Sequence, residues 1–244
     1  LVLLIWGSVV LIGTISSKFP HQTPVPRDGS GKKSHYTKDG HLKVSFENVR
    51  NSTFTPTYRS LQWIGGPDSE KGDKGLFLTY IDDAYVVKSV FDQDFYQQLL
   101  QGSTFVYENK NVTVDSFIAS PDLKRALIRS DTVKNWRHSS FGSYYVFDTE
   151  SSKFDFIGSN ISLAQWSPNS LDIAYVLEND LYLYSTQEKN TTFQITTDGN
   201  TQVFNGKPDW VYEEEVLEGD TALWWSPKGD YLSFFKINET EVNE

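Results

Sequence analysis

The sequence predicts an all-β fold in which repeated four-stranded units form part of a β-propeller. Three observations support this prediction. From about residue 42 onward, short aromatic and β-branched segments, such as 76–80 and 143–147, are bounded by polar turns. A Ser-Pro turn between two such segments recurs along the chain, and long amphipathic helical patterns are missing.

The recurring turn contains Pro121, Pro168 and Pro227, which are 47 and 59 residues apart. A strand, a Ser-Pro-x-x turn and a second strand, repeated at about this period, are typical of propeller blades. Proline presets φ, and the Asp, Asn or Gly that follows tolerates the bend. Residues 61–64 (LQWI) resemble a degenerate first copy. The longer second interval predicts an insertion between Pro168 and Pro227.

Two units fit four strands each. The expected strands are 114–119, 125–129, 143–148 and 153–157 in one unit, and 162–166, 172–176, 180–184 and 192–196 in the next. A β-sandwich of similar strands is the alternative, and the recurring turn favours the propeller. About three units and the opening of a fourth fit into the chain. Propellers usually need at least four blades, so we expect a fragment of a longer protein that does not fold stably alone.

The first 17 residues (LVLLIWGSVVLIGTISS) carry no charge. A membrane span needs about 20 residues, so we interpret 1–17 as a transmembrane signal-anchor whose beginning is missing. The core of a cleaved signal peptide and a buried soluble helix are the alternatives. Residues 18–40, rich in Pro, Gly, Ser, Lys and His, are typical of a flexible lumenal stem, and 41–244 form the N-terminal part of the propeller domain.

Five N-x-S/T sequons predict glycosylation and passage through the secretory pathway, with the C-terminal side in the lumen in a single-pass type II topology. They are Asn51, Asn111, Asn160, Asn190 and Asn238.

Composition excludes several classes of function. The formal net charge is −10, without the basic stripe of a nucleic-acid binder. Cysteine is absent, which excludes disulfides, thiolate metal sites and a cysteine nucleophile. The four histidines, His21, His35, His41 and His138, have no ligand-like spacing. We therefore expect no metal and no cofactor.

The most informative motif is the acidic run DWVYEEEV at 209–216, inside the expected insertion. Adjacent carboxylates on a strand would point to opposite faces. Pro208 before the run, Asp209 as a cap and Gly219 after it instead predict a short helical element at about 209–217.

Crowded carboxylates among apolar neighbours favour a cationic ligand. A primary ammonium, such as a free peptide N-terminus with a pKa of about 8, would be satisfied by two carboxylates and one further acceptor. Two sheltered charge-assisted hydrogen bonds, at roughly 1.5–3 kcal/mol each, would select a free N-terminus over a blocked one. The alternatives are a solvated acidic face and pairing with a local Arg or Lys.

The run DWVYEEEV, the following ALWWSPKGDYL, and NWRHS at 135–139 resemble the propeller domain of the dipeptidyl peptidase IV family over about residues 40–244. The resemblance implies an eight-bladed propeller over an α/β-hydrolase domain, and removal of X-Pro or X-Ala dipeptides from free N-termini. It implies that Glu214 and Glu215 bind the substrate amine, and that Arg137 contacts the carbonyl of the second residue back from the cut.

No G-x-S-x-G motif occurs in the chain. The resemblance places the serine triad beyond residue 244, so we assign no catalytic residue, His138 included. We expect the substrate-selecting part of a membrane-anchored serine dipeptidyl aminopeptidase that acts on peptides with a free N-terminus. The alternatives are a non-catalytic family member that binds membrane proteins, and a truncated inactive product. The resemblance further implies the lumenal side of the vacuolar membrane, with the Golgi as the alternative, and it is compatible with a homodimer.

Overall fold

The computed structural model describes residues 44–55, 61–65, 73–188 and 191–242. The structure divides into two compact regions between Thr57 and Tyr58, and each is described by itself. The predicted boundaries at 17 and 40 fall outside the described residues and remain predictions. None of the helices in the described ranges has the length and hydrophobicity that a membrane span requires.

The described part of the first region contains the short helix α2 (Phe46–Arg50). Its cap is Ser45, whose hydroxyl accepts the N–H of Asn48 at 3.1 Å, while the Asn48 side chain accepts the N–H of Ser45 at 3.0 Å. This reciprocal capping box satisfies backbone donors that a helix start leaves free. It explains why a helical turn forms here, where the sequence analysis expected strands.

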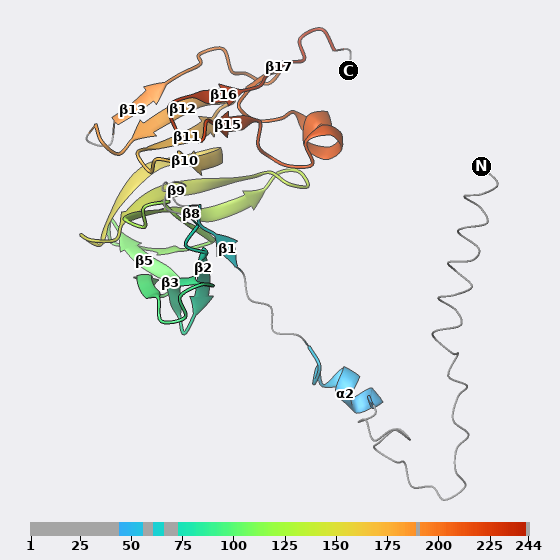
Figure 1. Cartoon of the computed structure of the whole chain (residues 1–244). Helices are drawn as coiled ribbons and strands as arrows, with labels where there is room; N and C mark the ends of the chain where they lie inside the picture. Colours follow the sequence, from blue (N-terminus) through green and yellow to red (C-terminus); the bar gives the residue numbers. More distant parts are fainter. Residues whose placement is uncertain (1–43, 56–60, 66–72, 189–190, 243–244) are drawn as a thin grey trace, which may run out of the picture. The chain divides into compact units, whose positions relative to one another are not determined.

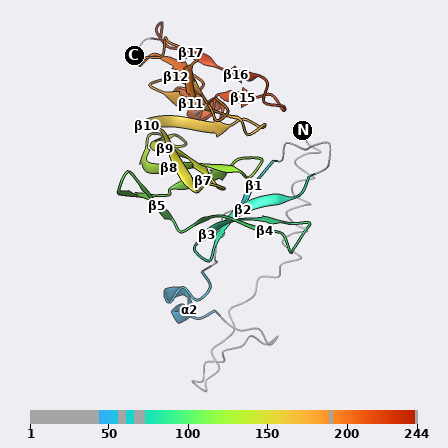
Figure 2. The same ribbon diagram turned by 90° about the vertical axis from the view of Figure 1, so that its left-hand side faces the viewer.

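The second region contains antiparallel strands, and from β1 to β13 the strands of each sheet follow one another in chain order (Figures 1 and 2). The first sheet has the order β1-β2-β3-β4 and is followed by the hairpin β5-β6. The strands are β1 (Gln62–Trp63), β2 (Leu76–Ile81), β3 (Ala84–Ser89), β4 (Tyr96–Gln101), β5 (Thr104–Tyr107) and β6 (Lys110–Thr113). The segment predicted as a degenerate first copy, 61–64, thus supplies the first strand of a four-stranded sheet.

The next seven strands form one continuous hydrogen-bonded sheet that contains two four-stranded units. They are β7 (Ser116–Ala119), β8 (Arg125–Lys134), β9 (Ser140–Asp148), β10 (Lys153–Trp166), β11 (Asp172–Leu177), β12 (Asp180–Ser185) and β13 (Thr191–Gln194). Each of the eight predicted strand segments overlaps one of these seven strands, with ends shifted by a few residues.

Strand β10 joins the two units, where the sequence predicted two separate strands. Its first half pairs with β9 and its second half with β11, and the register shifts on either side of Ile161. Gly158 lies at one of these shifts, and Asn160 has a φ of 58°. Such bulges bend a strand without ending it, so β10 can leave one unit and enter the next.

The last strands belong to a further unit and enclose the predicted insertion. β15 (Leu223–Trp225) pairs with β16 (Leu232–Phe234), and β14 (Val203–Asn205) pairs with β17 (Lys236–Asn238). A π-helix, Tyr212–Val216, lies between β14 and β15. The described strands therefore make three four-stranded units and the opening of a fourth, which confirms the predicted repeat.

In the described residues the core consists of three apolar clusters, one between each four-stranded unit and the next. Alternating residues of β8 show the principle: Ala126 and Ile128 belong to the first cluster, whereas Leu127 belongs to the second. In β11, Ile173 belongs to the second cluster and Ala174 to the third. Because successive strand residues point to opposite faces, each inner sheet buries apolar side chains on both faces.

The Ser-Pro turns repeat their hydrogen bonds as well as their sequence. The hydroxyls of Ser120, Ser167 and Ser226 accept the N–H of the residue five positions later, each at 3.0 Å. Neighbouring turns also touch, because the Ser170 hydroxyl accepts the N–H of Asp122 at 3.0 Å. The serine is therefore the structural centre of each turn, and the turns connect successive units.

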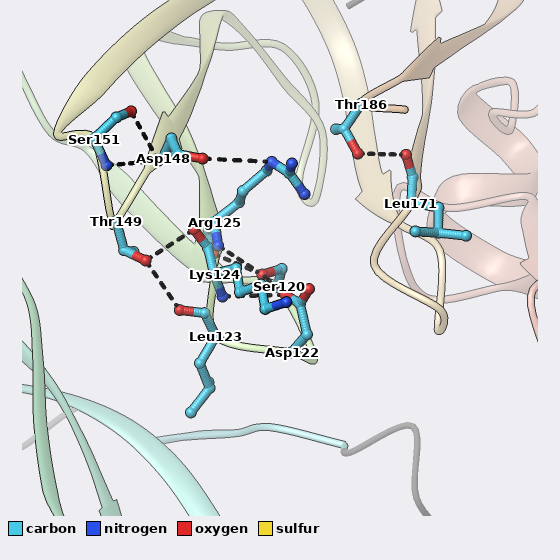
Figure 3. A network of polar contacts seen from close by, with 10 residues as sticks. All are labelled: Ser120, Asp122, Leu123, Lys124, Arg125, Asp148, Thr149, Ser151, Leu171 and Thr186. Atoms are coloured by element: carbon cyan, nitrogen blue, oxygen red, sulfur yellow. Dashed lines mark hydrogen bonds and ion pairs between the residues drawn. The ribbon is translucent and has the colours of Figure 1, made fainter. Parts of the chain in front are cut away.

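In two of the described repeats, a threonine at the end of the third strand completes the turn (Figure 3). Thr149 donates its hydroxyl to the carbonyl of Lys124 at 2.8 Å, and Thr186 donates to Leu171 at 2.7 Å. The two threonines occupy equivalent positions one residue after strands β9 and β12. The sequence analysis missed this part of the repeat, because a single threonine after a strand has no distinctive neighbours.

We expect Ser167→Ala to lower the free energy of unfolding by about 1–3 kcal/mol, because it leaves the N–H of Asp172 without its side-chain acceptor in a buried turn. Urea denaturation of the gene product that carries this chain, followed by tryptophan fluorescence, measures this change. The matched control is Ser226→Ala in a more exposed turn, where we expect a smaller loss. Equal effects of the two substitutions would contradict the structural role of burial at this turn.

Candidate functional site

The acidic run forms the helical element that the sequence predicted. Asp209 accepts the N–H of Tyr212 through its carboxylate at 2.7 Å and so caps the turn. The N–H of Leu217 then bonds to the carbonyl of Tyr212 at 2.8 Å, five residues back, which is the π-helical pattern. Single π-helical turns are rare and frequently occur at functional sites.

This π-helix contacts the tip of the long β8–β9 hairpin, which contains the second motif, 135–139 (Figure 1). Glu213 makes the central contact. Its side chain is completely buried, and its Oε1 atom accepts the N–H groups of His138 and Ser139, both at 2.8 Å. A buried carboxylate that accepts two backbone donors fixes a loop firmly, so Glu213 is the anchor between the two motifs.

Glu214 and Arg137 form an ion pair across the same contact. Arg137 Nε lies 2.9 Å from Glu214 Oε2, and Glu214 Oε1 accepts the backbone N–H of Arg137 at 3.1 Å. The Glu214 side chain is 7% exposed, whereas that of Arg137 is 70% exposed. The structure thus brings together two predicted site residues that are 77 positions apart, and it leaves the arginine accessible from solvent.

Glu215 differs from Glu214 in exposure and partners. The residue is exposed, and within the described ranges it has no ion pair and accepts no hydrogen bond. The sequence predicts two sheltered carboxylates around one amine, with pairing to a local Arg or Lys as an alternative. In the described residues, Glu214 is sheltered and pairs with Arg137, as that alternative states, whereas Glu215 beside it is exposed and has no partner.

The other predicted positions are consistent with surface sites. Asn51, Asn111, Asn160 and Asn238 are exposed, while Asn190 lies outside the described residues. His138 contributes its backbone N–H to Glu213, and the residue is exposed.

Comparison with known proteins now identifies the family. The sequence model of the family described as the dipeptidyl peptidase IV N-terminal region matches residues 120–244, more than half of the chain. The chain belongs to this family.

Relatives of known sequence agree with this assignment. Dipeptidyl aminopeptidase B of Saccharomyces cerevisiae is 56% identical over 244 residues, which is all of this chain and 29% of the yeast protein. The probable dipeptidyl-aminopeptidase B of Chaetomium globosum is 37% identical over 222 residues, covering 82% of this chain and 24% of that protein. The chain therefore spans less than a third of the length of either relative.

A solved structure supports the fold. The crystal structure of Porphyromonas gingivalis dipeptidyl peptidase 4 aligns with a TM-score of 0.66 and 21% identity, covering 82% of this chain and 28% of that one. At this identity the likeness shows the fold alone. It confirms the predicted partial β-propeller.

The sequence analysis missed the role of Glu213. It treated the three glutamates as one acidic cluster and assigned ligand binding to the second and third. The available signal was the length of the run: one helical turn cannot direct three successive carboxylates to one ligand, so at least one must point elsewhere. Only the contact with the hairpin shows which one is buried.

We expect Glu213→Gln to lower the free energy of unfolding by about 1.5–3 kcal/mol, because the two hydrogen bonds lose their ionic acceptor. The amides of His138 and Ser139 should exchange their hydrogens faster, which hydrogen-exchange mass spectrometry measures. Glu218→Gln, at an exposed position after the π-helix, is the control. Unchanged exchange at the hairpin tip would contradict the anchoring role.

Proposed function

We propose that this chain is the substrate-selecting part of a serine-type dipeptidyl aminopeptidase, which releases X-Pro and X-Ala dipeptides from peptides with a free N-terminus. The contact of Arg137 with Glu214 beside the free carboxylate of Glu215 carries the proposal. Membership of the dipeptidyl peptidase IV family supports it.

The chemistry of the site favours a primary ammonium. An ammonium carries three donors and a full charge, and Glu215 offers a carboxylate that no described residue occupies. Glu214 offers a second carboxylate, held in place by Arg137. Since the two glutamates are neighbours on a helical turn, an amine between them would receive two charge-assisted hydrogen bonds. A blocked N-terminus has neither the charge nor all three donors.

Arg137 would bind the peptide behind the amine. Its guanidinium keeps several N–H donors beyond the Nε atom that pairs with Glu214, and its exposure leaves them accessible. A backbone carbonyl two residues from the amine is a suitable acceptor. Fixing the amine and this carbonyl together would set the distance to the bond that is cut, which is a positioning effect.

The hydrolytic residues are proposed to lie outside these 244 residues, because the sequence contains no G-x-S-x-G motif. The substrate-binding role is therefore tested in the gene product that carries this chain.

We expect Glu214→Gln and Glu215→Gln each to lower kcat/KM for an Ala-Pro aryl amide by about 10- to 150-fold, which corresponds to one charge-assisted hydrogen bond. Steady-state release of the aryl amine measures this. Glu218→Gln, exposed and outside the site, should keep the parent rate. Values within twofold of the parent enzyme for both site variants would refute the proposal.

We further propose that the protein is a single-pass type II glycoprotein of the vacuolar membrane, with the Golgi membrane as the alternative. The uncharged segment 1–17 and the sequons support this proposal. The exposure of the four described sequons agrees with it.

Deleting residues 1–17 should move the protein from the carbonate-resistant membrane pellet to a soluble fraction or prevent its entry into the secretory pathway. An endoglycosidase should increase the gel mobility of the intact protein, and Asn111→Gln should produce part of that shift. An intact protein that carbonate extracts completely would contradict membrane anchoring.

A further inference from the structure

We propose that Lys207 is a positioning residue for the amine site: its buried ammonium group holds the tip of the β8–β9 hairpin, which carries Arg137, against the segment that carries Glu213 and Glu214. This inference rests on the proposed function for its consequences in catalysis. The contacts that support it are observed among the described residues and do not depend on the proposed function.

Three aromatic rings surround the Lys207 ammonium. Its Nζ atom lies 5.8 Å from the ring centroid of Trp136, 5.4 Å from that of Phe141 and 5.8 Å from that of Phe204. The residue is only 4% exposed. A cation within about 6 Å of a ring centroid is attracted by the ring, at about 2 kcal/mol or more when it is desolvated.

The three rings come from different segments. Trp136 lies in the hairpin tip beside Arg137, Phe141 lies in β9 and Phe204 lies in β14. Lys207 itself directly precedes Pro208 and the capping residue Asp209. A single charge therefore connects the start of the helical turn with the hairpin that supplies the arginine.

Electrostatics connect Lys207 with the anchor as well. Burial lowers the pKa of Lys207, and the negative charges of Glu213 and Asp220 oppose this shift. Glu213 is fully buried, and its Oε2 atom has no hydrogen-bond partner among the described residues. A buried carboxylate without a compensating cation is strongly unfavourable, so Lys207 supplies a charge on which Glu213 depends.

A purely apolar role for Lys207 makes a different prediction. Lysine stems can fill space against aromatic rings without any function of the charge. Methionine has a similar length and packs well against rings. If only packing matters, Lys207→Met should behave like the parent protein.

The test compares Lys207→Met with Lys207→Arg in the gene product that carries this chain. The control is Lys228→Met at an exposed position of the third Ser-Pro turn. Two experiments are done: one measures hydrogen exchange at the amides of His138 and Ser139, and the other measures kcat and KM for the Ala-Pro aryl amide. The exchange measurement is independent of catalysis.

We expect Lys207→Met to speed exchange at both amides at least 10-fold and to raise KM about 10-fold, with kcat changed less than threefold. Lys207→Arg should restore most of both quantities because it retains the charge, and Lys228→Met should match the parent protein. If Lys207→Met fails to fold, the double variant Lys207→Met/Glu213→Gln should recover folding, since it removes both buried charges.

Parent-like exchange in Lys207→Met, or failure of the double variant to recover a misfolded single variant, would overturn the inference. So would parent-like KM in Lys207→Met when Glu214→Gln and Glu215→Gln impair the enzyme. The proposed function fails separately, if the two glutamate variants leave kcat/KM unchanged. Fast exchange in Lys207→Met would then still support the positioning of the hairpin.

Discussion

Burial on both faces of each inner sheet is the constraint on which this structure depends. Neighbouring residues of one strand, such as Ala126 and Leu127 in β8, enter different apolar clusters. Since the inner sheets of the described part bury apolar residues on both faces, each four-stranded unit is stable only against its neighbours. The order of the units along the chain then becomes their order in space, and equivalent loops come to lie at equivalent places.

The site lies where the chain departs from this regular pattern. The insertion before β15 does not pair as an ordinary strand, and its helical turn bonds through side chains to the tip of the β8–β9 hairpin. Glu213 accepts two backbone N–H groups of this hairpin tip. The rigid sheets therefore support a contact between two irregular segments, which is a common arrangement for binding residues.

The three successive glutamates at this contact differ in burial and in the partners of their carboxylates. Glu213 is fully buried and fixes the hairpin, Glu214 is sheltered and pairs with Arg137, and Glu215 is exposed with its carboxylate free of described partners. One side of the turn thus serves structure and the other is accessible to a ligand. The three carboxylates therefore differ in burial, and among the described residues only Glu215 has no partner.

The sequence by itself determined the class of fold, the repeat and the helical nature of the acidic run. These follow from local chemistry: strand propensities at 143–147, the Ser-Pro turns at Ser120, Ser167 and Ser226, and the cap at Asp209. Only the tertiary structure decided that β10 runs through two units, that Glu213 is the anchor and that Lys207 lies among Trp136, Phe141 and Phe204. Those outcomes depend on which distant segments meet, and hydrophobic burial, which brings the segments together, is not directional along the chain.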